Sequence, residues 1–195
     1  NFPRAENFGL NINVFMGKEQ EEGDQREFWD YTNYSEGIFV GYRWFDKQGI
    51  NVSYPFGYGM SYTTFAYSKP TVKATKDGFT ATVTVTNTGK VAGKEAVELY
   101  VAAPKGGLDK PARELKSFAK TRELRPGESQ TLTMNVTAYD LASYNEQTQS
   151  WETAAGIYSV QFGANVEDIR ATATYRQSKA MAVKCHDVMR PDMQL

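Results

Sequence analysis

From residue 69 onward, apolar and small polar side chains alternate along the chain, and this period of two constrains the fold more than any other feature. Residues 79–86 alternate apolar side chains with threonine almost without interruption, which is typical of a strand with one buried face. Comparable strand patterns recur at 96–101, 115–124, 131–136, 143–145, 149–152, 156–162 and 169–175. Turn residues separate them, as at 87–90 and 125–128. About seven short strands with this spacing predict an antiparallel β-sandwich.

Residues 1–68 have a different texture, with Gly, Tyr, Phe, Asn and Asp scattered without a sustained period. Residues 10–15 predict one short strand, and 38–45 predict a short strand or a helix that ends in a turn at 46–49. The acidic run 19–30 predicts a solvated loop. A segment of this length with so little regular structure and many large apolar side chains is expected to be one edge of a larger domain.

Charge and composition exclude several classes of function. The formal net charge of -1 provides no field that favours nucleic acid or an anionic membrane surface. No apolar run approaches the roughly 18 residues that a membrane helix needs. The chain also opens without Met and without a secretory signal, from which we expect a fragment or a processed product. We therefore predict neither a nucleic-acid partner nor a membrane partner.

The sequence offers no complete set of metal ligands or cofactor-binding residues. His186 is the single histidine and adjoins Cys185, the single cysteine, whereas structural zinc usually takes four protein ligands. The acidic run 19–30 lacks the spacing of an EF-hand, and phosphate-binding glycine loops and serine elbows are absent. Cys185 lies in a tail without a base held by a third group. We predict no metal site, no cofactor and no catalytic nucleophile.

Three motifs in series resemble family 3 glycoside hydrolases of the β-glucosidase type. Residues 34–46 (YSEGIFVGYRWFD) resemble the end of the family's α/β-sandwich catalytic domain. Residues 54–65 (YPFGYGMSYTTF) resemble the run that leads into a fibronectin type III-like domain, and 85–89 with 92–101 are similar to the core of that domain. Residues 2–4 (FPR) also match a family element. The resemblance covers nearly the whole chain in the family's order.

The resemblance implies a mainly β fold, in which a fragment of an α/β domain precedes an immunoglobulin-like, fibronectin type III-like antiparallel sandwich. We predict four parts: the domain fragment at 1–50, a linker at 51–68, the sandwich at 69–176 and a C-terminal tail at 177–195. Within the tail, residues 181–183 could add a short edge strand to the sandwich. Alternating aromatic residues and glycines at 56–59 predict a sharp turn in the linker, with the two rings buried on opposite sides.

For function, the resemblance implies a retaining exo-β-glycosidase that removes terminal β-linked sugars. Glycoside hydrolysis needs a pair of carboxyl groups. In this family the nucleophilic Asp lies in the N-terminal domain and the acid/base Glu lies upstream of the FPR element, so both are outside this chain. We interpret Glu36 as a structural or interdomain carboxylate. The chain is then a stabilising part of a glycoside hydrolase, with no catalytic residue, and is predicted to be inactive alone.

The expected partners are the upstream catalytic domains of the same polypeptide and the parent enzyme's oligosaccharide substrate. A dimer through the exposed N-terminal region is also expected, and the compartment is predicted to be periplasmic or secreted. The apolar side chains that would support the dimer are Phe8, Phe15, Phe39, Tyr42, Trp44 and Phe45. We single out the loop 103–111, rich in Gly, Pro and Lys, as the part of the sandwich that could reach an active-site mouth.

The alternative function is a stand-alone carbohydrate-binding or interaction module. Such a module would stack sugar rings on exposed aromatic side chains such as Trp151, aligned on the same face of neighbouring strands. Trp151 has no other aromatic residue in its own strand, which argues against this alternative. A cell-surface sandwich without a sugar role would leave the motif at 54–65 unexplained.

Overall fold

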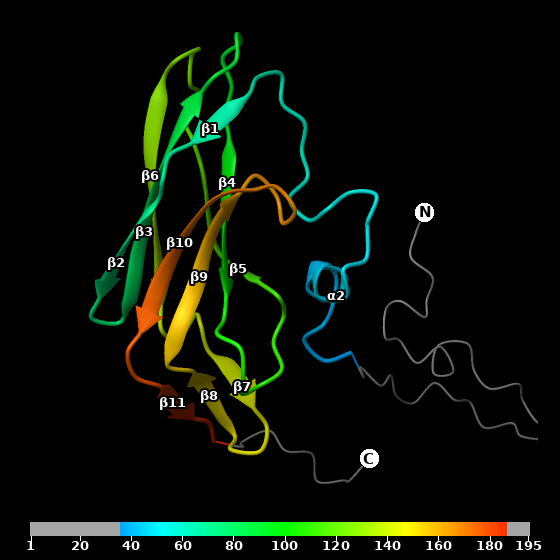
Figure 1. Cartoon of the computed structure of the whole chain (residues 1–195), viewed down its shortest axis with the longest axis vertical. Coiled ribbons are helices and arrows are strands. Elements are labelled where there is room, and N and C mark those ends of the chain that lie inside the picture. Colours follow the sequence, from blue (N-terminus) through cyan, green and yellow to red (C-terminus); the bar gives the residue numbers. More distant parts are fainter. Residues whose placement is uncertain (1–35, 187–195) are drawn as a thin grey trace, which may run out of the picture. The chain divides into compact units, whose positions relative to one another are not determined.

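The computed structural model describes residues 36–186, which belong to two compact units divided between Tyr54 and Pro55 (Figure 1). In the first unit, the described residues form one short helix, α2 (Tyr42–Gln48). Gly49 ends it in the left-handed conformation at φ 63°, where glycine carries no steric penalty. The peptide N–H of Ile50 donates to the Phe45 carbonyl at 2.9 Å. The helix therefore covers most of the predicted turn at 46–49.

The second unit is an antiparallel β-sandwich, as expected. In one four-stranded sheet, β3 (Gly78–Asn87) pairs with β1 (Phe65–Tyr67), β2 (Thr71–Thr75) and β6 (Ser129–Thr137). The other has the order β10 (Ile169–Gln177), β9 (Gly156–Gly163), β4 (Ala96–Ala102) and β5 (Glu114–Lys120). A three-stranded sheet, β11 (Met181–Lys184), β8 (Ser150–Thr153) and β7 (Ser143–Asn145), lies at one end (Figure 1).

The core forms where the alternating apolar residues of the two large sheets meet. Along β3 every second side chain is buried, and the threonines between them lie on the outer face. Those threonines pair across the sheet, as in the hydroxyl contact of Thr84 with Thr131 at 2.8 Å. The largest core side chains include Phe79, Val83, Val85, Leu99, Tyr158, Val160 and Phe162. The alternation seen in the sequence thus defines both faces of this sheet.

Three strands lie outside the predicted strand set or its expected limits. β2 was not predicted, because it is an edge strand whose residues are mostly exposed. β1 lies inside the predicted linker 51–68. β11 lies inside the predicted tail 177–195, at the short edge strand predicted for 181–183, and pairs with β8. The predicted strand 115–124 ends at Lys120, and Leu124 instead forms an isolated bridge with Gly93. The ordered sheets therefore extend beyond the range 69–176.

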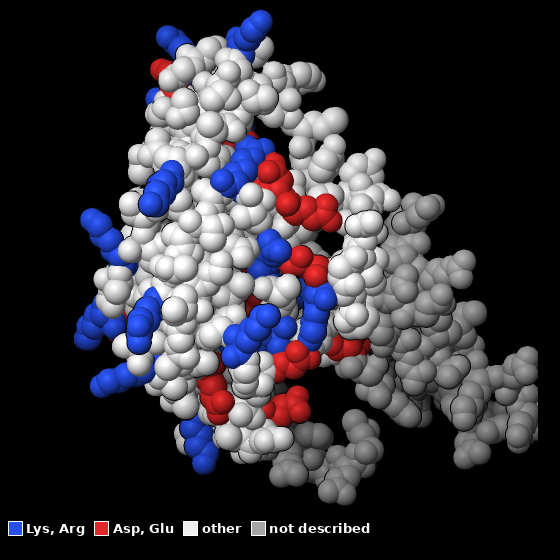
Figure 2. Space-filling model, in the orientation of Figure 1, with Lys and Arg blue, Asp and Glu red and all other residues white. Residues whose placement is uncertain are grey.

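Charged side chains of both signs are interspersed over the middle of the face shown in Figure 2, in keeping with the net charge of -1. Among residues 36–186, no helix has the length and apolarity needed to cross a membrane.

Candidate functional site

Asn87, at the end of β3, fixes the start of the sandwich to its core. The side chain is fully buried, and its Nδ2 donates to the carbonyls of Val91 and Leu124, each at 2.8 Å. Its Oδ1 accepts from the Thr63 hydroxyl at 2.7 Å and from the Gly89 N–H at 3.0 Å. Two donor and two acceptor positions of the amide are therefore used. The motif at residues 85–89 therefore has a structural role, because its Asn87 joins several segments of the sandwich.

The segment 55–58 is held against β4 by its backbone. The Phe56 carbonyl accepts from the Val166 N–H at 3.0 Å. Gly57 has φ 83°, and a Cβ at this position would lie 2.4 Å from the Glu98 carboxylate oxygens. Glycine is thus required here both by conformation and by the close approach to Glu98. Burial raises the pKa of Glu98, and the hydrogen bond donated by the Tyr100 hydroxyl opposes that rise.

The side chains of this junction are not buried as predicted. Phe56 is 46% exposed and Tyr58 is 50% exposed, whereas we expected both rings to be buried on opposite sides. Met60 and Tyr62 are almost fully exposed. The expectation of two buried rings was therefore wrong. The junction, defined here as residues 55–62, therefore presents apolar side chains from an anchored backbone.

A charged cluster fastens β1 to the second sheet. Arg170 donates to Glu95 at 2.8 Å, to Asp168 at 2.7 Å and to the Phe65 carbonyl at 3.3 Å. The Tyr67 hydroxyl donates to Glu95 at 3.0 Å. Burial raises the pKa of Glu95 against the opposing effects of Tyr67 and Arg170, and burial beside Glu95 raises the pKa of Tyr67. We assign the cluster a structural role, because Tyr67 and the Phe65 carbonyl, both in β1, are bonded through it to Glu95 and Arg170.

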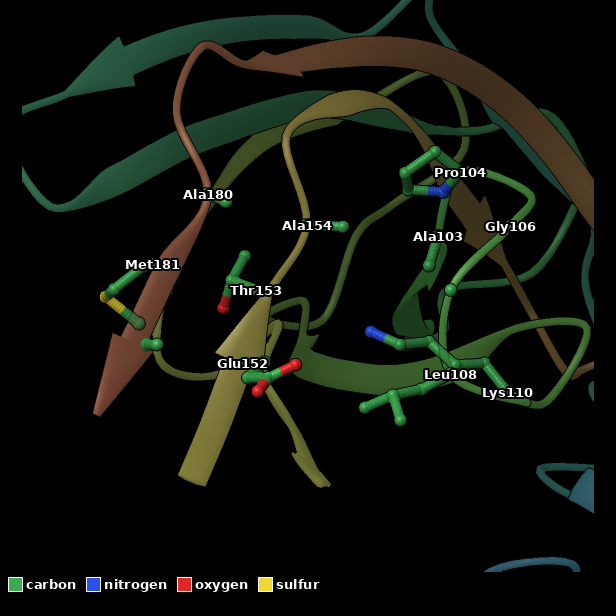
Figure 3. Close-up of a pocket in the computed structure, with 12 residues that line it drawn as sticks. Ala103, Pro104, Gly106, Leu108, Lys110, Glu152, Thr153, Ala154, Ala180 and Met181 are labelled. Atoms are coloured by element: carbon green, nitrogen blue, oxygen red, sulfur yellow. The ribbon is translucent and has the colours of Figure 1, made fainter. Parts of the chain in front are cut away.

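A pocket of about 240 Å³ lies beside the loop that the sequence singled out at 103–111. Its walls come from that loop, from the end of β8 and from β11 (Figure 3). Lys110 extends into the pocket from the loop side, and Glu152 lies on the opposite wall (Figure 3). The lining residues are Ala103, Pro104, Gly106, Gly107, Leu108, Lys110, Glu152, Thr153, Ala154, Ala180, Met181 and Ala182. The loop therefore does form a concave surface, on the sandwich itself.

Trp151 belongs to an aromatic cluster that the sequence did not reveal. Tyr144 is its register partner across β7 and β8, with ring centroids 5.6 Å apart, and Tyr139 lies 5.9 Å away. Tyr139 and Tyr144 are 52% and 43% exposed. The sequence argument against a sugar-stacking surface considered only the strand that contains Trp151. Pairing of the hairpin supplies aromatic neighbours, so the objection to a sugar-stacking surface does not hold.

Among residues 36–186, the other residues considered from the sequence do not assemble into a site. Glu36 lies in a turn before α2, where its carbonyl accepts from Phe39, and its role stays a prediction. Cys185 is partly exposed, and its N–H donates to the Gln149 carbonyl. Within 36–186, no group of three or more potential metal ligands is found. The acidic run 19–30, the strand predicted at 10–15, and the side chains Phe8 and Phe15 lie outside the described residues.

The known proteins that this chain resembles include β-glucosidases. Residues 95–166 match the model of the fibronectin type III-like domain. β-Glucosidase A of Butyrivibrio fibrisolvens is 42% identical over an alignment of 180 residues that covers 80% of this chain and 21% of that protein. A β-glucosidase of Bacteroides ovatus is 39% identical over 165 residues, or 83% of this chain and 21% of the relative.

Solved structures give a similar result. β-Glucosidase 3B of Thermotoga neapolitana, solved in complex with glucose, has a TM-score of 0.75 and 42% identity, covering 78% of this chain and 21% of that one. The β-D-glucoside glucohydrolase of Trichoderma reesei has a TM-score of 0.70 and 34% identity, covering 73% and 23%. The chain thus spans about a fifth of the length of the curated relatives that it matches.

Proposed function

This chain is a C-terminal part of a family 3 glycoside hydrolase of the β-glucosidase type, and from that premise we propose that it stabilises the catalytic domains of its parent enzyme without supplying a catalytic group. The parent enzyme removes terminal β-linked sugars from oligosaccharides with retention. Its nucleophilic Asp and its acid/base Glu belong to upstream domains. The sandwich is then the support on which those domains are held.

The observation that carries this proposal is the junction 55–62, which is anchored to the sandwich and has apolar side chains that are half to almost fully exposed. The Val166–Phe56 hydrogen bond and the approach of Gly57 to Glu98 fix its backbone to the sandwich. Phe56, Tyr58, Met60 and Tyr62 are between about half and almost fully exposed. Apolar side chains gathered on a fixed backbone are typical of a surface that packs against another domain. We assign that surface to the catalytic domains of the same polypeptide.

The test uses the full-length parent polypeptide with Phe56→Ala and Tyr58→Ala combined. We expect the inactivation temperature of this variant to fall by several degrees, because the catalytic domains lose their apolar contacts with the exposed half of each ring. Activity on an aryl β-glucoside at 25 °C should be unchanged. Phe118→Ala, at an aromatic residue of β5 that is 72% exposed, is the control and should leave the inactivation temperature unchanged. Equal behaviour of the two variants would contradict the proposed role of the junction.

Two further parts of the proposal concern assembly and compartment. Ile38 and Val40 are 43% and 50% exposed, which supports self-association through the N-terminal region of the chain. Light scattering should show a dimer that Ile38→Asp weakens, and a monomer at all concentrations would overturn this part.

The periplasmic or secreted location is tested by fractionating cells that produce the parent polypeptide.

A second candidate function is binding of polysaccharide on the aromatic cluster of Tyr139, Tyr144 and Trp151. The observation that favours it is the exposure of two of these rings on one end of the sandwich. Aromatic faces can stack on the apolar faces of sugar rings. Retention of the chain on insoluble cellulose, xylan or laminarin should fall in Trp151→Ala and persist in Phe118→Ala, a control residue that is 72% exposed on β5. Absence of retention rejects this candidate.

A further inference from the structure

The pocket between the loop 103–110 and strands β8 and β11 contains charged groups that the stabilising role leaves unused. We propose that it binds one ring of a neutral sugar, with Lys110 and Glu152 as its polar contacts. The choice of a sugar rather than another neutral polyol rests on the proposed function. Three features of the pocket support a binding site: its small volume, the unpaired ammonium group of Lys110, and the opposite charges of Lys110 and Glu152.

Size limits the ligand to a small one. The pocket has a volume of about 240 Å³, below the roughly 300 Å³ at which pockets for drug-sized molecules begin. Its loop wall is held in place, since a Cβ at Gly156 would lie 2.9 Å from the Pro104 ring. Gly106 and Gly107 adopt φ 95° and 89°, and added Cβ atoms there would meet no other group. The loop therefore combines a fixed base with an open rim, which suits the end of a chain or a single ring.

Lys110 is an unpaired cation directed into the pocket. Within residues 36–186 its ammonium group makes no hydrogen bond or ion pair, although the side chain is half-buried. Nearby Glu114 is instead paired with Lys116 at 3.2 Å. Burial lowers the pKa of Lys110, although Glu114 partly offsets the effect. A partly desolvated ammonium without a partner gains from any ligand that brings acceptor oxygens.

Glu152 is a fixed acceptor on the opposite wall. Its Oε1 accepts from the hydroxyls of Thr148 at 2.6 Å and Ser150 at 2.9 Å, and its Oε2 accepts from Asn145 at 3.1 Å. These donors hold the pKa of Glu152 below its ordinary range, so the carboxylate stays ionised at neutral pH. A carboxylate offers about four acceptor positions, and three are occupied. One position remains for a hydroxyl of a ligand.

The opposite charges select the kind of ligand. An anion attracted by Lys110 meets the Glu152 carboxylate, and a cation attracted by Glu152 meets the Lys110 ammonium. Sugar hydroxyls both donate and accept, so a neutral ring satisfies the two groups together. Leu108 and Met181 supply apolar contacts beside them, which match the C–H face of a pyranose. Charge and polarity therefore favour a neutral sugar over a simple ion.

The test is an NMR titration of the isotope-labelled chain with glucose, and separately with cellobiose. We expect concentration-dependent shifts confined to amides at 103–110, 152–154 and 180–182. Lys110→Met should weaken binding at least about tenfold, the effect of losing one charge-assisted hydrogen bond. Lys105→Met is the matched control, because Lys105 lies in the same loop but is exposed and does not line the pocket. It should leave the affinity unchanged.

Three results would overturn the inference: no shift with either sugar, equal weakening by the two lysine variants, or stronger binding of acetate or glycine than of glucose. Trp151→Ala separates this site from the aromatic cluster, since it should leave the pocket shifts in place. Failure of sugar binding leaves the stabilising role untouched, because that role is measured by inactivation of the full-length parent polypeptide.

Discussion

The sandwich and the segment 36–54 use similar apolar residues in opposite ways. In the sandwich, side chains spaced by two residues on facing sheets meet in one buried cluster. In the segment, α2 contains Tyr42, Trp44 and Phe45 within one short helix, yet none of its residues is buried. When apolar and polar side chains alternate along the strands, each sheet has one apolar face, and the two sheets bury these faces against each other. A seven-residue helix has too few side chains to form such a surface by itself, and the stability of so short a helix in isolation is marginal in water.

Removing a buried ring from the sandwich core should have the largest effect on the free energy of unfolding. Phe162→Ala deletes a fully buried side chain of β9 and should lower the free energy of unfolding by about 3–5 kcal/mol. Ile38→Ala, at an exposed position of the other region, should change it by less than about 0.5 kcal/mol. Chemical denaturation followed by circular dichroism measures both. Comparable losses would show that the two regions share one stabilising core.

A polar residue in the sandwich should have nearly as large an effect. Asn87→Ala leaves the carbonyls of Val91 and Leu124 and the N–H of Gly89 without their side-chain partner. Because buried unpaired groups cost about 1–3 kcal/mol each and part of this cost is relieved by water, we expect a loss of about 3 kcal/mol. Asn135→Ala, on the exposed face of β6, is the control. A similar loss in both variants would disprove the anchoring role of Asn87.

The junction between the two regions is tested by a pair of glycines. Gly57→Ala places a Cβ against Glu98 at a positive φ, so the segment should detach locally while the sandwich stays folded. At a cost of about 1–2 kcal/mol, chymotrypsin cleavage at Phe56 and Tyr58 should rise roughly tenfold. A Cβ at Gly59 meets nothing within 4 Å, so Gly59→Ala should not change the rate. Equal rates in the two variants contradict the close approach.

The smallest effect concerns the pH dependence of the sandwich. Burial raises the pKa of Glu98 in the folded state, so ionisation of this group opposes folding as pH rises through the raised pKa. Below the ordinary pKa range of a glutamate, native and Glu98→Gln chains should have the same melting temperature. At pH 7 the variant should be slightly the more stable. Melting curves from pH 4 to 7 test this, and a variant that is less stable at pH 7 would refute it.

Much of the fold was predictable because period-two patterns report burial directly. The residues 79–86, 131–136 and 156–162 all lie in strands with alternating buried positions. β2 was missed because an exposed edge strand has no such signal. Helix α2 was predicted only as one of two options, since its apolar residues do not alternate in either period.

The candidate site was less predictable, because it depends on contacts between distant segments. The loop 103–111 was recognised from its composition, but its pocket needs Glu152 and Met181 from strands far along the chain. The aromatic cluster depends on the register that pairs Tyr144 with Trp151. Phe56 and Tyr58 are about half exposed on either side of Gly57, whose close approach to Glu98 no pattern of residue types encodes. Sequence patterns indicate which face is buried, whereas long-range pairing decides what gathers there.

The most direct test of the account is hydrolysis of an aryl β-glucoside by the purified chain alone. We predict no turnover above the buffer rate, because both catalytic carboxyl groups are assigned to upstream domains. The full-length parent polypeptide, assayed alongside, should be active. Turnover by the isolated chain that survives further purification and disappears in Glu36→Gln would contradict the central claim, since it would place a catalytic group within these residues.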